Sequence, residues 1–139
     1  MFFTKKVMID PVQQNITNRI AAGTVLKGEY MSKEGLLVQG SVCGEPLVIE
    51  GGILIIEAGG QLLGRVRVMG DCYIFGQAGD PSHVDGGLDL EVYGTIHVAA
   101  TGVTHGAIAF HHLASYEGSS LNSKARSIPL HIKSPYLSA

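Results

Sequence analysis

Hydrophobic and polar residues alternate with a period of two over a long stretch in the middle of the chain. From residue 54 to residue 76 every even position is apolar or glycine, whereas the odd positions include Glu57, Arg65 and Asp71. Such alternation is typical of extended backbone with one face buried. A strand normally has about 3–10 residues, so this stretch must bend several times while the same side chains stay inside. The side chains expected to fill one narrow core are Leu54, Ile56, Leu62, Val66, Val68, Ile74, Leu90, Val92 and Ile96.

Glycine recurs at a second, longer interval. Gly23, Gly40, Gly59, Gly76 and Gly94 are separated by 17, 19, 17 and 18 residues. Regular repeats of this kind are typical of solenoids, and about 18 residues suit one coil of three short strands, with glycine where the backbone bends tightly. The pattern predicts an all-β parallel solenoid of about five to six coils without a helix.

Changes in composition mark the ends of the predicted body. We expect a flexible tail at residues 1–19, the solenoid at 20–122 and a flexible basic tail at 123–139, where alternation is lost. The polar stretch QAGDPSHVDGG at 77–87 predicts a loop inserted at a corner of one coil.

Composition and charge exclude several classes of protein. The chain has 139 residues, 45% of them hydrophobic, and a net charge of −2, so it is not mainly disordered. Residues 20–118 combine four basic with eleven acidic residues, a net of −7, which argues against general nucleic-acid binding. The two ends are basic. They can contact anionic lipid or the acidic body of a neighbour, or they can be solvated without a partner.

No motif points to catalysis or to a cofactor. The intervals from His83 to His97 and from His97 to His112 are 14 and 15 residues, which do not match the coil period, and no acid or cysteine completes a zinc site. The P-loop, GxSxG and HExxH motifs are absent. Cys72 has the buried parity and Cys43 the opposite one, and two cysteines make no disulfide framework. We therefore predict no catalytic residue, no metal and no cofactor, and a reducing cytoplasm as the compartment.

Residues 16–76, from ITNRIAAGTVLKGEYMSKEGLLVQG to GRVRVMGDCYIFG, resemble the bactofilins, which are bacterial polymer-forming cytoskeletal proteins. The resemblance continues through residues 88–122. It implies a right-handed β-helix between disordered tails, with subunits that assemble end to end without nucleotide and scaffold cell shape or cell-wall machinery. The family's last coil carries a terminal aromatic residue, and Leu121 stands in its place here.

The ends of a β-helix expose unpaired backbone groups and an uncovered core. No capping helix is expected before Gly23, and residues 118–122 are small apart from the apolar Leu121. We therefore expect end-to-end stacking, which nothing closes, so that fibres form. The side chains predicted at this polymer interface are Ile108, Phe110, Leu113 and Leu121 in the last coil, and Val25 and Leu26 in the first coil.

The first residues of the chain combine two aromatic with two basic side chains. Phe2 and Phe3 can insert at a lipid interface, and Lys5 and Lys6 can attract anionic headgroups. A polymer would strengthen such weak contacts by multivalency. A solvated N-terminus without a membrane role is the other interpretation. The predicted partners are the chain itself, anionic inner-membrane lipid and cell-wall enzymes, with a cytoplasmic location that becomes peripheral to the inner membrane if the lipid contact forms.

An enzyme class also has coils of similar length. Hexapeptide-repeat acyltransferases are left-handed β-helices with a catalytic histidine between the subunits of a trimer. The body lacks their strict aliphatic-Gly-x-x hexad and a C-terminal helix, and its glycines recur irregularly. Handedness and acyl-CoA binding distinguish this alternative from the structural polymer.

Overall fold

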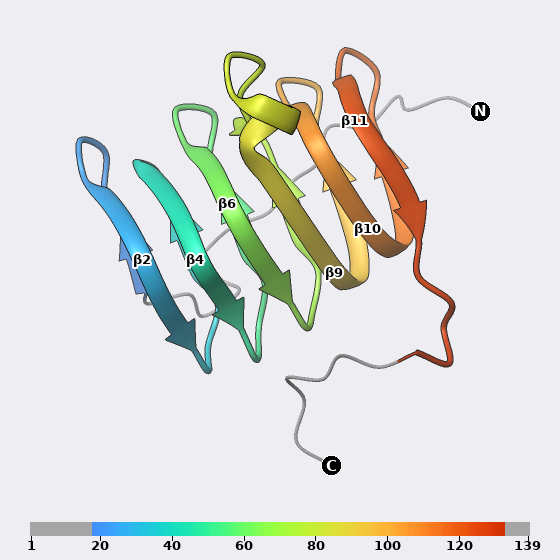
Figure 1. The fold of residues 1–139 in the computed structure, drawn as a ribbon, viewed down its shortest axis with the longest axis horizontal. Helices are drawn as coiled ribbons and strands as arrows, with labels where there is room; N and C mark the ends of the chain where they lie inside the picture. The colour runs from blue at the N-terminus through green and yellow to red at the C-terminus, as the bar shows by residue number, and fades with distance from the viewer. Residues whose placement is uncertain (1–17, 133–139) are drawn as a thin grey trace.

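The computed structural model describes residues 18–132, and almost all of them belong to parallel strands or to the turns between them (Figure 1). The first coils each combine a long strand with a short one, whereas β9 and β10 run through both faces of their coils. The long strands are β2 (Val25–Ser32), β4 (Ser41–Ile49), β6 (Gln61–Val68), β9 (Leu88–Val98), β10 (Val103–Ser115) and β11 (Ser120–Ser127). The short strands are β1 (Asn18–Ile20), β3 (Leu36–Val38), β5 (Leu54–Ile56), β7 (Cys72–Ile74) and β8 (Gln77–Ala78).

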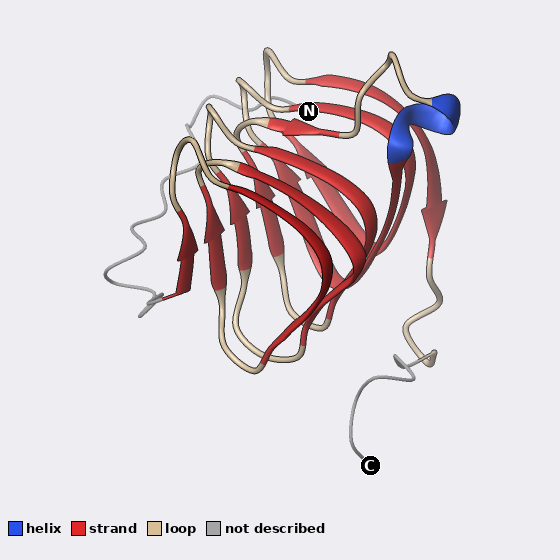
Figure 2. Ribbon diagram, turned by 60° about the vertical axis from the view of Figure 1, so that its left-hand side comes forward, coloured by secondary structure: helices blue, strands red, loops and turns tan. Residues whose placement is uncertain are grey.

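The strands stack in two continuous parallel ladders. The long strands follow one another along the chain from β2 to β11, with the piece β8 filling part of one rung. On the short face β1, β3, β5 and β7 stack in order, and the second halves of β9 and β10 continue that ladder. Figure 2 shows the chain winding from one face to the other in every coil. The fold is a parallel β-solenoid of about six turns, which confirms the predicted all-β solenoid.

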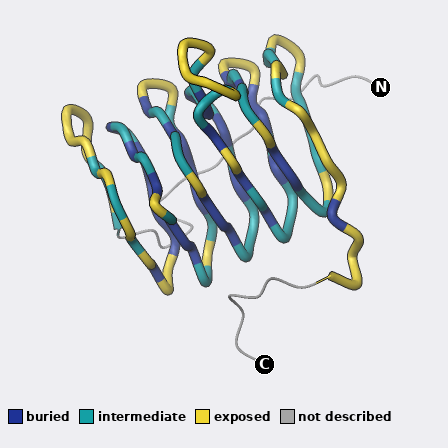
Figure 3. The backbone as a smooth tube through the Cα atoms, viewed as in Figure 1, coloured by how far each residue is buried: buried dark blue, intermediate teal, exposed yellow. Residues whose placement is uncertain are grey.

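The alternating pattern sets which side chains fill the interior. All nine residues expected in the core have no exposed surface, and they form one hydrophobic cluster with Cys72 and Ala78. Because neighbouring coils stack in register, each inward side chain lies above a side chain of the previous coil, as Val66 does over Leu47. Figure 3 shows this buried column running through the middle coils. The prediction of the core from parity is confirmed.

Glycines stack at the corner that precedes each long strand. A Cβ atom on Gly40, Gly60, Gly76 or Gly102 would overlap backbone carbonyl oxygens of the preceding turn. Gly59 has open space around its Cα atom instead. A Cβ on Gly94 would meet Asp71 and Gly70 at the other corner of the coil. The nearly regular intervals between glycines in the sequence therefore combine residues from two different corners of the coil.

The inserted loop, predicted at residues 77–87, interrupts a strand of the long face. The prediction that it lies at a corner of the coil is therefore wrong. Gln77 and Ala78 pair with Gln61 and Leu62 of β6, and the ladder resumes where Leu88 pairs with Gly64. Residues 79–87 therefore leave the long face in the middle of a rung and include the short 3-10 turn η1 (Val84–Gly87). This turn projects from the solenoid in Figure 2.

The boundaries of the body also differ from the expected ones. Strands begin at Asn18 and end at Ser127, whereas the sequence predicts a body at 20–122. Residues 123–127 remain in β11 because they pair along β10, from Gly106 to Phe110. Residues 1–17 and 133–139 lie outside the described part of the chain.

The stacked glycine corner leads to a stability prediction. Gly76→Ala should lower the free energy of unfolding by about 1–3 kcal/mol, because the new methyl group would overlap the Glu57 and Gly60 carbonyl oxygens. Gly59→Ala is the matched control, since nothing lies within reach of its added Cβ. Urea unfolding followed by circular dichroism measures both. Equal midpoints for the two variants would contradict the close approach at Gly76.

Candidate functional site

The N-terminal end of the solenoid is formed by β1 and β2. In the described residues, β2 has a strand neighbour on one side only, β4, and β1 likewise pairs only with β3. Leu26 and Tyr30 face inward from β2 and pack on the core while remaining half-buried. Val25 and Met31 point outward and are 75% and 56% exposed. This end therefore presents an open parallel edge with apolar side chains beside it.

The C-terminal end has two levels. Strand β11 covers β10 from Val103 to Phe110, but residues 112–115 of β10 have β9 on one side and no described strand on the other. Leu113 lies in that open segment, half-buried against the core. Leu121 lies on β11 and is 42% exposed. An open edge and incompletely covered apolar side chains therefore occur at this end as well.

The structure places the six predicted interface residues at different depths. Leu113 and Leu121 lie at the C-terminal end, and Val25 and Leu26 lie at the N-terminal end. Phe110 is half-buried against the core and has Ser127 of β11 paired over it, so it lies one rung inside the end. Ile108 is 1% exposed, because Ala125 of β11 pairs over it and places it one rung inside the end.

Sequence reasoning missed two inward residues of the N-terminal end, Ile20 and Tyr30, both of which pack on the core. Both occupy even positions, the same parity as the predicted core. The alternation does not run unbroken to the N-terminus, because an irregularity in β4 puts Leu47 and Ile49 in the core at odd positions. The repeated coil length was the signal that could have found Ile20 and Tyr30.

The membrane contact and metal binding are the other kinds of site that the sequence raised. Phe2, Phe3, Lys5 and Lys6 lie outside residues 18–132. Within those residues no helix is long and apolar enough to cross a membrane. The same range holds no group of three or more His, Cys, Asp and Glu side chains that could bind a metal ion.

A buried arginine connects coils on the long face. Arg67 is 9% exposed although it points out of the core. Its Nη1 donates to the Asp89 carbonyl at 2.9 Å, and its Nε lies 3.3 Å from Glu91 Oε1. Arg126 of β11 reaches the other oxygen of Glu91 at 3.6 Å, so one carboxylate joins β6, β9 and β11.

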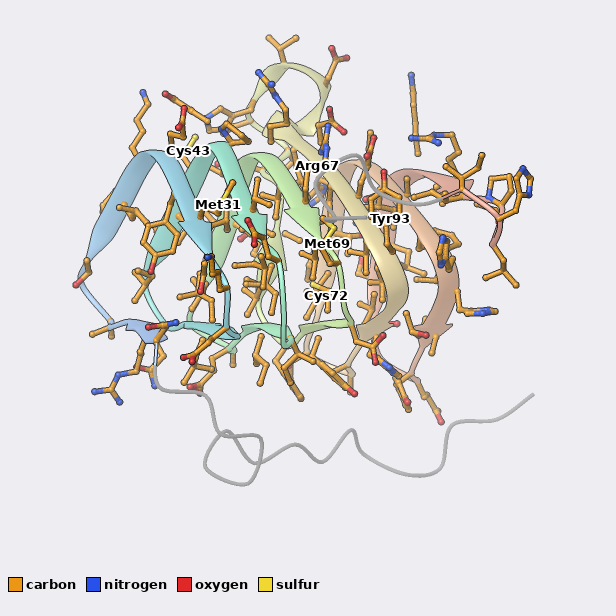
Figure 4. All side chains as sticks on the ribbon, turned by 90° about the horizontal axis from the view of Figure 1, so that it is seen from below. Met31, Cys43, Arg67, Met69, Cys72 and Tyr93 are labelled. Carbon is orange, nitrogen blue, oxygen red and sulfur yellow. The ribbon has the colours of Figure 1, made fainter. Side chains whose placement is uncertain are left out.

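Tyr93 belongs to the same group of side chains and is labelled with Arg67 in Figure 4. Its hydroxyl donates to Glu91 Oε1 at 2.9 Å. Burial, followed by this hydrogen bond and the charge of Glu91, raises the pKa of Tyr93. The network satisfies the buried charge of Arg67 and links β6, β9 and β11 across the intervening strand β10.

Aromatic rings stack on the outer side of the short face. The Tyr73 and His97 rings lie 4.4 Å apart and nearly parallel, and Tyr116 lies 6.4 Å from His97. Burial lowers the pKa of His97, although Asp71 opposes the shift. Cys72 faces the interior between the two faces (Figure 4), and burial raises the pKa of its thiol. Cys43 is half-buried.

A prediction for pH dependence follows from His97. Because burial lowers its pKa from the ordinary value of 6.5, the folded chain binds this proton less tightly than the unfolded chain. The contribution of neutral His97 to the free energy of unfolding is complete above pH 6.5. It decreases as the pH falls from 6.5 through the pKa of His97 in the folded chain. His97→Phe keeps a ring beside Tyr73 and should flatten the loss of stability between about pH 7 and about pH 5.

Thermal melts across that pH range measure the effect, with the exposed His112→Phe as control. If His97→Phe and the unmodified chain lose the same stability on acidification, the neutral state of His97 does not contribute to folding.

Comparison with known families gives one result for this chain. The sequence model described as "Bactofilin: Polymer-forming cytoskeletal" matches residues 18–126, from the first strand of the N-terminal end to Arg126 of β11. That family is structural and polymer-forming, a class different from the hexapeptide-repeat acyltransferases. Comparisons with curated proteins and with solved structures give no match.

Proposed function

The chain belongs to the bactofilin family of polymer-forming cytoskeletal proteins, and we propose that it assembles end to end into filaments without nucleotide. These filaments would scaffold cell shape or recruit cell-wall enzymes. The observation that supports this proposal is the open strand edge at each end of the described solenoid. The chain has a cytoskeletal, structural role through its family, and the joint between subunits is the part that we propose.

The joint would continue the interactions that hold the coils together. A second subunit stacked on an open edge supplies partners for its unpaired N–H and C=O groups, each net hydrogen bond contributing about 0.5–1.5 kcal/mol. The joint also covers half-buried apolar side chains, including Leu26 and Tyr30 at one end and Leu113 at the other. Burial of one leucine contributes about 1.5–3 kcal/mol. Apolar burial and ladder pairing can therefore drive assembly without nucleotide hydrolysis.

A charged side chain at the C-terminal end tests the joint. Leu121→Arg should give folded, soluble small species, because it removes an apolar contact and places an unpaired charge in the joint. Phe110→Arg tests the same end on the neighbouring strand β10, where Phe110 pairs with Ser127, six ladder positions beyond the Leu121–Thr104 pair. Electron microscopy and sedimentation should show loss of filaments, while circular dichroism retains the β-sheet spectrum.

The matched control is Val84→Arg, which adds the same charge at the 89% exposed tip of the inserted loop and should leave filaments unchanged. Filaments of normal length from both Leu121→Arg and Phe110→Arg would locate the joint elsewhere.

We also propose that the N-terminal residues contact anionic lipid of the inner membrane. The support is the sequence itself, in which Phe2 and Phe3 precede Lys5 and Lys6. Aromatic side chains favour the interface, and each lysine near an anionic surface gains about 1 kcal/mol. One chain would bind weakly, and a filament would bind through many such segments.

Deletion of residues 1–6 should leave filaments intact and reduce their co-sedimentation with anionic liposomes. Replacing Lys5 and Lys6 by glutamate should weaken binding similarly, since it reverses the attraction to anionic headgroups. Neutral liposomes provide the comparison for the electrostatic part. Co-sedimentation that is unchanged by the deletion would remove the proposed lipid contact and leave the assembly proposal unaffected.

A further inference from the structure

The outer side of the short face carries an apolar column. Leu37, Ile55, Tyr73 and His97 pair in register through β3, β5, β7 and β9. Their neighbours along each strand, such as Leu54 and Ile56, fill the core. Because successive side chains of a strand alternate between its two faces, the column points away from the core. Outward positions of a solenoid are usually polar, so this column requires a physical explanation.

Leu37 and Ile55 are buried although they point outward. Their exposed fractions are 6% and 1%. On the long face the outward Val48 is buried to the same extent, but it lies between Met31 and the long side chain of Arg67. The main contacts of β5 are with β3 and β7 beside it in the ladder and with β6 next along the chain. Figure 1 and Figure 2 show no described helix or strand lying over the outside of the short strands. The two segments of the chain outside the described residues, 1–17 and 133–139, are therefore the candidates for a cover.

The position of β1 indicates which segment provides the cover. Arg19 of β1 pairs with Leu37 and so begins the same outward column. Asn18, where the described residues begin, therefore lies on this face beside Leu36. The other segment, 133–139, follows Ile132, whose carbonyl lies 3.3 Å from His111 Nε2 on β10, near the opposite end.

The length and composition of residues 1–17 suit this face. An extended segment of 17 residues spans about 56 Å, and the six rungs from β1 to β10 need only about 24 Å at 4.8 Å per step. The segment is rich in apolar side chains, which are Phe2, Phe3, Val7, Met8, Ile9, Val12 and Ile16. The Nδ1 atom of His97 is buried without a hydrogen-bond partner, and a backbone N–H of a covering segment could donate to it.

We propose that residues 1–17 dock on the outer side of the short face of their own chain, over Leu37, Ile55 and the Tyr73–His97 ring pair. The proposal concerns a single subunit and does not depend on the polymer joint. Docking has a consequence for lipid binding, because Phe2 and Phe3 cannot cover this face and insert into a membrane at the same time. The outer face would therefore compete with lipid for the N-terminal segment.

Hydrogen exchange of the full chain tests the docking. In the unmodified protein, peptides from residues 1–17 should exchange at least about tenfold more slowly than the free synthetic peptide 1–17. Ile55→Glu places a charge under the segment without entering the core, and it should restore fast exchange there. Val84→Glu, on the exposed loop tip, is the matched control and should keep the protection. Exchange of residues 1–17 in the unmodified chain as fast as in the free peptide would overturn the proposal.

A second measurement does not depend on the folding of Ile55→Glu. A chain lacking residues 1–16 should bind the synthetic peptide 1–17 in trans, and binding should be at least about tenfold weaker when Tyr73→Glu is also introduced. Absence of peptide binding to the truncated chain would contradict docking. Protection that disappears on dilution of the full chain would assign the face to a second copy instead and would also overturn the proposal.

Discussion

The whole molecule depends on in-register parallel stacking of successive coils. Each rung obtains its backbone hydrogen bonds and its apolar neighbours from the rung before it and the rung after it. The requirement is strictest at the corners, where Gly76 lies against carbonyl oxygens of the preceding turn. A coil that shifted by one residue would turn its inward side chains to the outside. The constraint therefore fixes the core and leaves the first and last rungs incomplete for the same reason.

This constraint gives the two faces of the solenoid different properties. The long face carries a charge network, in which Arg67 is buried against Asp89 and Glu91. The short face carries an outward apolar column and a ring stack around His97. The charged groups of the network on the long face find their partners on neighbouring rungs of that face. The short face buries Leu37 and Ile55 without cover from the described strands, and this difference locates the proposed docking of the N-terminal segment.

Much of the fold could be predicted from alternation alone, because parity reports directly on which side of a strand a residue lies. Val66, Val68 and Cys72 are buried as their even positions indicated. Spacing was a weaker guide to the corners. The insertion at 79–87 lengthens one coil, so Gly94 aligns with Gly70 rather than with Gly76.

Local sequence also does not reveal which residues lie on neighbouring rungs. The burial of Arg67 depends on carboxylates 22 and 24 positions later in the chain. Ile108 is interior because β11 adds a rung where loss of alternation suggested a tail. Parity identifies the face on which a side chain lies, but the order and number of rungs determine its distance from an end.

The inserted turn η1 gives each subunit a directional mark. It leaves the long face at one rung only, between Ala78 and Leu88. Six rungs of the long face at 4.8 Å each amount to about 29 Å. In a filament whose subunits all point the same way and continue one ladder, the turns would form a row with a repeat of about 29 Å. If the subunits alternated in orientation, the turns would occur in pairs at twice that repeat. The spacing of this protrusion along a filament therefore distinguishes a polar filament from a non-polar one.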